Sequence, residues 1–347
     1  MSTFPIPGPL SLGDLLDRSF RLYRARFGIF VATAALFLVP LSVVSGLLTG
    51  TFVTDYLDAL TALGTGGQAP SEDAVFRAFG GALSFASAMF ILGIIALVLN
   101  GIVTLALTNQ SIAALNGESL TIGQGVGRAM RRFWPLLRMS ILQGLAFFFS
   151  TVAILVVLGI LVFLVVAVGV AIGLSVDSLG DTAGIVAAVG LGLILVCGYI
   201  LALILLLLPV VYLSARWVVA VPALVNEEWG ARETLRRSWA LTAGGVWRAV
   251  GYVILLWLIG TLVIYLPVGV FQQILLILLS FAAPGMATMI STALGSLFSV
   301  LWVPFNAGAL VLLYYDLRVR KESYDLEMRI DRMAAEVEEK RNVDEQA

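Results

Sequence analysis

The sequence predicts an all-α, polytopic membrane protein with six transmembrane helices, and three observations support this fold class. Hydrophobic residues make up 60% of the 347 residues and charged residues only 12%, with a mean hydropathy of +1.01, whereas a soluble domain is about a quarter charged. Several long stretches contain no Asp, Glu, Lys or Arg, and the basic residues cluster in alternate connecting segments. These stretches are 27–54, 78–117, 139–176, 182–215 and 249–315.

The charge-free stretches predict the individual crossings. About 20 apolar residues in a helix cross the hydrocarbon core of a bilayer, so each of the first four stretches provides one crossing. The last stretch is long enough for two, and Gln272 and Gln273, followed by the Ala-Ala-Pro-Gly sequence at 282–285, divide it. We expect the short apolar piece 274–281 to form a re-entrant or interfacial turn. The predicted crossings are 28–51, 82–107, 143–172, 184–212, 248–271 and 287–313.

The distribution of basic residues predicts the orientation. With six crossings, every Lys and Arg except Arg77 lies on the same side as the N-terminus. Cytoplasmic loops of membrane proteins carry an excess of Lys and Arg, so both termini are predicted to be cytoplasmic. The first apolar stretch lacks a small-residue cleavage site, and we expect it to remain as an anchor.

Three cytoplasmic segments resemble one another, and each is a basic amphipathic stretch that leads into a pair of crossings. Arg18, Arg128 and Arg237 occupy corresponding positions at nearly even spacing, as expected for an internal repeat. We therefore predict a membrane domain at 1–315 and a charged, helical cytoplasmic tail at 316–347. The simpler alternative is that any basic amphipathic segment before a crossing has this composition. The predicted repeats cover about 9–115, 116–225 and 226–315, each an in-plane amphipathic helix followed by a transmembrane hairpin.

The arginines of these segments are candidates for binding lipid headgroups. An amphipathic helix at the interface buries its apolar stripe while its cations meet anionic phosphates. Ordinary anchoring at the interface explains the same composition. The candidate residues are Arg18, Arg21, Arg128, Arg131, Arg236 and Arg237.

The membrane interior offers little reactive chemistry. Asn100 and Asn306 are its main polar candidates, and we expect them to make hydrogen bonds between helices, with the lining of a path as the alternative. The sequence contains no histidine, the commonest general base and metal ligand, and we expect the single Cys197 to be a small buried apolar residue. We predict no catalytic residues, cofactor or metal, and the net charge of −1 gives no reason to expect nucleic-acid binding.

Three stretches together resemble the membrane domain of glycerophosphoryl diester phosphodiesterases. They are the opening segment 9–24, the central segment 222–239 and the closing segment 314–327. The resemblance implies an integral membrane module that is sometimes fused to a catalytic barrel. We expect this chain to lack that barrel, because the barrel uses histidines and metal-binding carboxylates. Residues that match the closing motif have no known chemical role, and pairs four residues apart could fix the exit of the last helix. They are Tyr315, Asp316, Arg318, Arg320 and Asp325.

These observations predict a non-catalytic module in the plasma membrane of a prokaryote, which scaffolds, anchors or regulates partners at the cytoplasmic face. Anionic lipids are its expected partners, and the charged tail could dock on a protein partner. The alternative function is transport of a lipid or small apolar solute, since three hairpins could surround a cavity. A polar-lined cavity at the bilayer midplane would favour the transporter.

Overall fold

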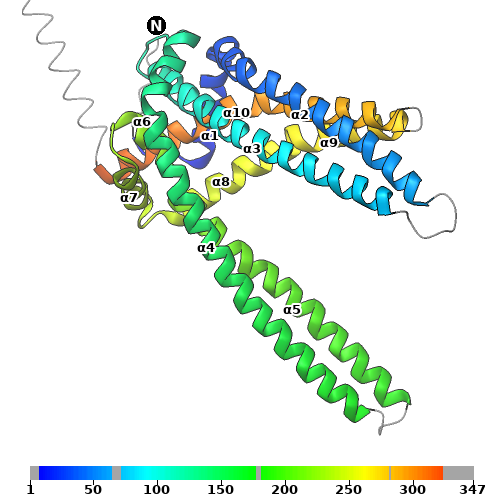
Figure 1. The fold of residues 1–347 in the computed structure, drawn as a ribbon. Helices are drawn as coiled ribbons and strands as arrows, with labels where there is room; N and C mark the ends of the chain where they lie inside the picture. Colours follow the sequence, from blue (N-terminus) through cyan, green and yellow to red (C-terminus); the bar gives the residue numbers. More distant parts are fainter. Residues whose placement is uncertain (1–7, 65–71, 177–180, 281–282, 323–347) are drawn as a thin grey trace, which may run out of the picture.

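The computed structural model describes residues 8–64, 72–176, 181–280 and 283–322. Throughout this described part the regular elements are helices, and six segments are long and apolar enough to cross a membrane (Figure 1). The predicted all-α fold with six candidate crossings is therefore confirmed. The six segments are Phe27–Tyr56, Ala78–Leu115, Ile122–Leu164, Leu208–Asn226, Val246–Leu279 and Gly285–Glu322.

The first three helices are α1 (Leu12–Ala25), α2 (Phe27–Gly64) and α3 (Glu72–Leu115). Ser11 caps α1, because its hydroxyl accepts a hydrogen bond from the Asp14 amide at 3.1 Å while the Asp14 carboxylate binds the Ser11 amide. This capping box satisfies amide groups that a helix start leaves without partners. Leu15, Ser19 and Leu22 form the buried side of α1, so this short helix is docked on the rest of the protein.

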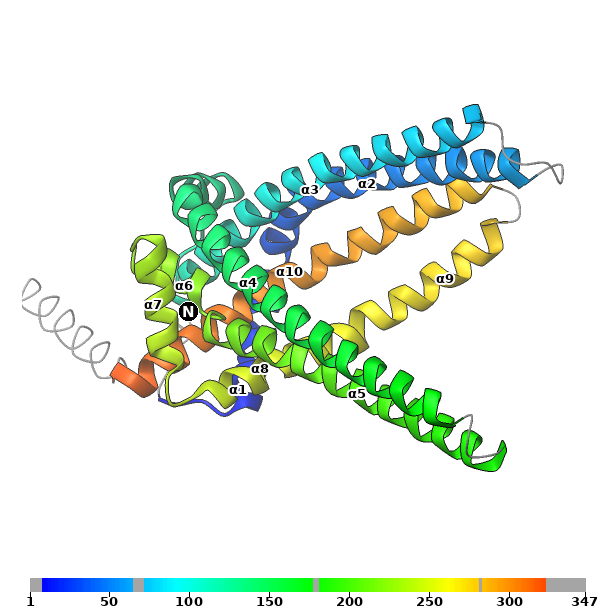
Figure 2. The same ribbon diagram turned by 60° about the horizontal axis from the view of Figure 1, so that its bottom comes forward.

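Helices α4 (Ile122–Val176) and α5 (Asp181–Arg216) form a hairpin whose far part stands apart from the other membrane helices (Figure 1 and Figure 2). The predicted fourth crossing, 184–212, lies within α5. The basic segment that begins at Ile122 is the first part of α4 and not a separate helix. Cys197 is exposed on α5, so its expected burial is wrong, because it lies in the far part of the hairpin (Figure 1).

The remaining helices are α6 (Ala220–Asn226), α7 (Ala231–Thr242), α8 (Val246–Gly260), η1 (Thr261–Tyr265), α9 (Leu266–Ser280) and α10 (Pro284–Glu322). Helix α8, the π-helix η1 and α9 follow one another without a break as a single candidate crossing. The predicted re-entrant turn at 274–281 is therefore wrong, since 274–280 continue α9. Instead of breaking the crossing, Gln272 donates a hydrogen bond to the Ser291 carbonyl of α10 at 2.6 Å, which satisfies its amide within the bundle.

Helices α2, α3, α8, α9 and α10 form the larger arm of the molecule. Helix α10 is the centre of this arm, and it packs closely on α2. A side chain at Gly50 would place its Cβ 2.6 Å from the Gly285 carbonyl, and one at Gly46 would lie 2.7 Å from the Met289 carbonyl. Glycine therefore permits this close helix contact. The core continues toward the cation-rich end, where Leu15, Tyr252 and Tyr314 are completely buried.

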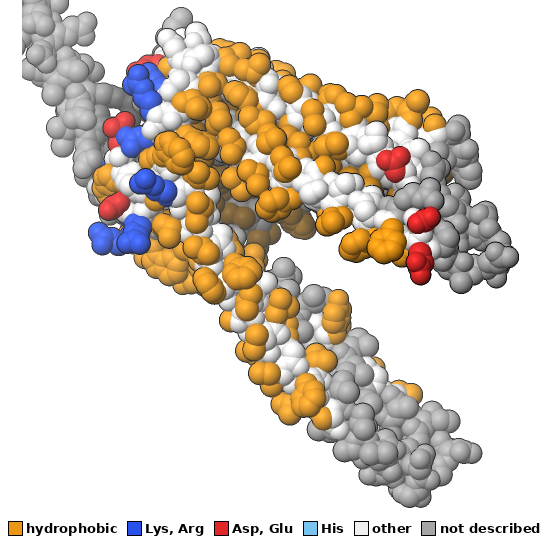
Figure 3. All heavy atoms as spheres, in the orientation of Figure 1, with side chains coloured by type: hydrophobic (Ala, Val, Ile, Leu, Met, Phe, Trp, Pro, Cys, Tyr) orange, Lys and Arg blue, Asp and Glu red, His pale blue; other side chains and the backbone are white. Residues whose placement is uncertain are grey.

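Charge is segregated along the molecule. In the face shown in Figure 3, Lys and Arg side chains gather at the end that carries α6 and α7, while carboxylates appear at the opposite end of the α2–α3 hairpin. Between these ends the surface is predominantly hydrophobic. This distribution matches a protein that crosses a bilayer with its basic end on one side.

Candidate functional site

The most organised polar region lies at the cation-rich end, around a carboxylate in the last helix. Asp316 in α10 has no exposed surface, although it is charged. Its carboxylate accepts hydrogen bonds from the Leu10 amide at 2.8 Å, from Arg248 Nε at 3.0 Å and from Arg320 Nε at 3.0 Å. These donors replace the water that a buried carboxylate loses, without which burial of the charge would be very costly.

The same two arginines also hold the N-terminal segment. The Leu10 carbonyl accepts a hydrogen bond from Arg320 Nη2 at 2.7 Å and another from Arg248 Nη2. Both backbone groups of Leu10 are thus bound by a group formed of one carboxylate and two guanidinium groups. We call Leu10, Arg248, Asp316 and Arg320 the Asp316 cluster. It ties the start of the described chain and α8 to α10.

A second ionic group lies nearby, between α6, α7 and the end of α10. Arg237 Nε donates to both carboxylate oxygens of Glu227 at 2.8 and 2.9 Å, and its Nη2 donates to Glu322 at 2.8 Å. Arg318 Nε also donates to Glu322, at 3.1 Å. Burial would lower the pKa of Arg237, but its hydrogen bonds to Glu322 and Glu227 and their negative charges raise it instead, so the guanidinium stays charged.

Aromatic hydroxyl groups extend this second group along α10. The Tyr314 hydroxyl donates to Glu227 at 2.6 Å and accepts from the Asn226 amide at 3.1 Å, while the Tyr315 hydroxyl donates to the Asn226 carbonyl at 3.1 Å. We call Asn226, Glu227, Arg237, Tyr314, Tyr315, Arg318 and Glu322 the Glu227 cluster. Because its members come from α6, α7 and α10, it fixes the two short helices α6 and α7 on the last helix.

The two clusters bring together most residues of the predicted closing motif. Arg320 pairs with Asp316 and Arg318 pairs with Glu322, both four residues apart on α10, as expected for helix pairs. Tyr315 joins the Glu227 cluster, and Asp325 lies outside the described residues. The sequence reasoning missed Leu10, Arg248 and Glu227 as partners. Glu227 lies within the central segment that carries the resemblance, and Arg248 directly precedes the last long apolar stretch. Neither feature of the sequence indicates which residue is the partner.

The other predicted site residues are placed differently. Arg21, Arg128, Arg131 and Arg236 are exposed and Arg18 is half-buried. Arg237 lies between two carboxylates in the Glu227 cluster, where its guanidinium is already bound. Asn100 donates to the Ala96 carbonyl of its own helix at 2.8 Å, and no hydrogen bond joins it to Asn306 in the part of the chain that the structure describes.

Chemically, these clusters are suited to holding helices together. Every carboxylate in them is already bound by arginine or tyrosine, so none is positioned as a free acid or base. Within the described ranges, no group of three or more His, Cys, Asp and Glu residues is placed to bind a metal ion.

Comparison with known families agrees with the resemblance in the sequence. Residues 195–344 match the family model described as the membrane domain of glycerophosphoryl diester phosphodiesterase. The matched region includes the central and closing segments, which supply the Glu227 cluster and the α8 and α10 parts of the Asp316 cluster. The match is to a membrane domain of that family and not to its catalytic domain. No curated protein and no solved structure matches the chain.

Proposed function

We propose that this chain is a non-catalytic integral membrane module that scaffolds, anchors or regulates partners at the cytoplasmic face. The observation that carries the proposal is the pair of ionic clusters at the cation-rich end. They hold the N-terminal segment, α6 and α7 on α10, where the charged tail begins. Buried polar groups that are fully paired favour one defined arrangement of helices, which is what a binding platform needs.

The proposed setting is the plasma membrane of a prokaryote, with both termini in the cytoplasm. The one-sided distribution of Lys and Arg supports this orientation. Within it, α1 and α7 would be the in-plane helices of the first and third repeats, and the start of α4 would serve the second. The docking of α1 through Leu15, Ser19 and Leu22 supports an in-plane position, because its exposed side then carries the arginines.

Anionic lipids are the expected partners of the exposed arginines. Each cation at an anionic membrane surface contributes roughly 1 kcal/mol of attraction, and several such residues act together here. Besides Arg237, the candidate arginines are Arg18, Arg21, Arg128, Arg131 and Arg236.

A protein partner is expected to bind through the tail, and a truncation tests this. A chain that ends at Glu322 retains both clusters but loses 323–347. We expect the full chain to copurify with a cytoplasmic or membrane protein after gentle solubilisation, and the truncated chain to lose that protein while remaining folded. Recovery of the full chain alone, or equal recovery of the partner with both chains, would contradict the proposal. Arg128→Gln with Arg131→Gln in the full chain shows whether the partner also needs the arginine surface.

A second candidate function, transport of a lipid or small apolar solute, is favoured by one cavity. It has a volume of about 390 Å³ and lies between α2, α3 and α10, where Ser42, Ser45, Asn100 and Ser299 contribute polar groups among apolar side chains. Vesicles reconstituted with the purified chain provide the test. Flux of a labelled lipid or amphiphile above that of protein-free vesicles supports transport, and its absence leaves the scaffold as the function.

A further inference from the structure

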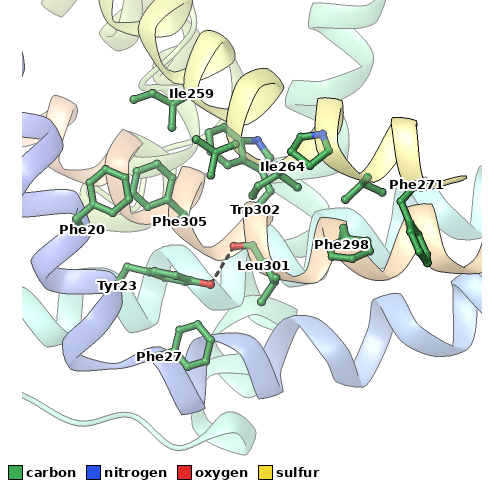
Figure 4. A pocket seen from close by; sticks show the side chains of 13 residues that line it. Phe20, Tyr23, Phe27, Ile259, Ile264, Phe271, Phe298, Leu301, Trp302 and Phe305 are labelled. Carbon is green, nitrogen blue, oxygen red and sulfur yellow. Dashed lines mark hydrogen bonds between the residues drawn. The ribbon is translucent and has the colours of Figure 1, made fainter.

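A larger cavity, of about 490 Å³, is bordered by α1, α10 and the crossing formed by α8, η1 and α9 (Figure 4). Its volume is within the range of small-molecule pockets. The lining is almost entirely aromatic and aliphatic. Seven aromatic side chains line it, namely Phe20, Tyr23, Phe27, Phe271, Phe298, Trp302 and Phe305.

The aromatic wall is held in place by contacts of its own. The rings of Phe20 and Phe305 lie 4.6 Å apart and those of Trp302 and Phe305 lie 5.3 Å apart, distances typical of favourable aromatic pairs. The Tyr23 hydroxyl donates to the Leu301 carbonyl at 3.1 Å, as the dashed line in Figure 4 shows. Across the gap, a Cβ at Gly260 would come within 2.7 Å of the Trp302 ring. Contacts within the protein therefore hold this wall, and the one lining hydroxyl is already hydrogen-bonded.

The opposite wall contains an uncommon element, the π-helix η1. The Leu266 amide donates to the Thr261 carbonyl five residues earlier, and the next residue, Pro267, has no amide hydrogen with which to continue a regular helix. π-Helical turns are rare and frequently occur at functional sites. Val263 and Ile264 of η1 and Pro267 of α9 all line the cavity, so the irregular backbone forms the wall itself.

The lining of the cavity extends along α10, and helix spacing places a cation beside its α1 end. On α10 its lining runs from Phe298 to Phe305, about 10 Å along the helix axis. At the α1 end, Arg24 follows Phe20 by four residues and therefore lies on the same side of α1. Arg24 is exposed, and no hydrogen bond or salt bridge connects it to the part of the chain that the structure describes.

We propose that this cavity holds one acyl chain of an anionic phospholipid, whose phosphate group binds Arg24. The inference rests on the membrane placement in the proposed function, since the cavity borders on lipid only if α8–α9 and α10 cross the bilayer. An acyl chain fits a space that is lined almost entirely by apolar side chains. A phosphate fits the unpaired guanidinium at the end of that space.

The test is native mass spectrometry of the full chain released from nanodiscs that contain equal amounts of phosphatidylglycerol and phosphatidylcholine. Val263→Trp fills the cavity from the π-helix, and Leu262→Trp places the same ring on the neighbouring exposed position, which does not line the cavity. We expect the wild type and Leu262→Trp to retain one phosphatidylglycerol. Val263→Trp should retain at least about tenfold less, equivalent to roughly 1.4 kcal/mol. Ile264→Trp, a second filling variant, should behave like Val263→Trp.

Arg24→Gln separates the phosphate contact from the chain contact. It should reduce the preference for phosphatidylglycerol about fivefold, equivalent to roughly 1 kcal/mol for one interfacial cation, while Lys321→Gln at the far end of α10 should not. Equal lipid retention by Val263→Trp and Leu262→Trp would overturn the proposal, as would the retention of a second copy of the chain in place of lipid. Either result would leave the membrane topology and the partner experiment unaffected, so the two proposals can fail separately.

Discussion

Asp316 is the residue on which the cation-rich end depends most. Its carboxylate is completely buried, yet it has three donors from three separate parts of the chain. Removing one partner of a buried ion pair is far more costly than removing a surface pair, because the remaining charges are left without compensation. The two guanidinium groups that would be left, Arg248 and Arg320, both lie close together on the Leu10 carbonyl.

Asp316→Asn therefore tests the structural role of this carboxylate. We expect the free energy of unfolding to fall by about 3 kcal/mol or more, seen as a lower thermal midpoint of the purified chain in detergent. Asp17→Asn is the matched control, because Asp17 also pairs with an arginine, Arg21 at 2.6 Å, but both side chains are well exposed. Such a surface pair contributes at most about 1 kcal/mol. Similar midpoints for the two variants would show that the Asp316 cluster does not stabilise the fold.

The Glu227 cluster predicts coupling between its members. Arg237→Gln leaves Glu227 and Glu322 without their shared cation, and Glu227→Gln removes the main carboxylate that Arg237 binds. The double variant should lower the free energy of unfolding by less than the two single variants lower it together. The difference should be about 0.5–3 kcal/mol, the range for residues in one network. The measurement is a double-mutant cycle on unfolding. Strict additivity would indicate that the two side chains act independently.

At the scale of elements, the contact between α2 and α10 determines how the larger arm is assembled. Gly50→Ala introduces a Cβ 2.6 Å from the Gly285 carbonyl, and relieving this overlap should destabilise the protein by about 1–3 kcal/mol. Gly28→Ala, on the same helix, meets no atom within 4 Å and should be neutral or stabilising by up to about 1 kcal/mol. The thermal midpoints of the two variants give the comparison. An unchanged thermal midpoint for Gly50→Ala would mean that α2 and α10 can move apart without loss of stability.

Several elements were predictable because their causes are local. The charge-free stretches indicated the crossings, and the spacing of Asp316 with Arg320 indicated a helix pair. The prediction at 274–281 was wrong because two adjacent glutamines were interpreted as the end of a crossing. In the structure, Gln272 is accommodated by the Ser291 carbonyl and by the space beside Gly295. Such a partner in another helix leaves no trace in the spacing of one sequence.

At the scale of the whole molecule, the candidate site could be predicted only in part. The bond between Leu10 and Asp316 joins residues 306 positions apart, and it depends on how the bundle closes. The α4–α5 arm illustrates the same limit, because its apolar composition predicts membrane crossings but not its separation from the other helices (Figure 2). The threefold repeat and the headgroup role of the arginines stay predictions.

The central claim is that the chain crosses the bilayer six times and places both ionic clusters on the cytoplasmic side. The most direct test labels single cysteines with an impermeant maleimide, in intact and in permeabilised cells, after Cys197→Ser. Asp55→Cys and Glu72→Cys should react in intact cells, whereas Glu118→Cys and Lys321→Cys should react only after permeabilisation. Reaction of Asp55→Cys and Glu118→Cys from the same side of the membrane would contradict the account.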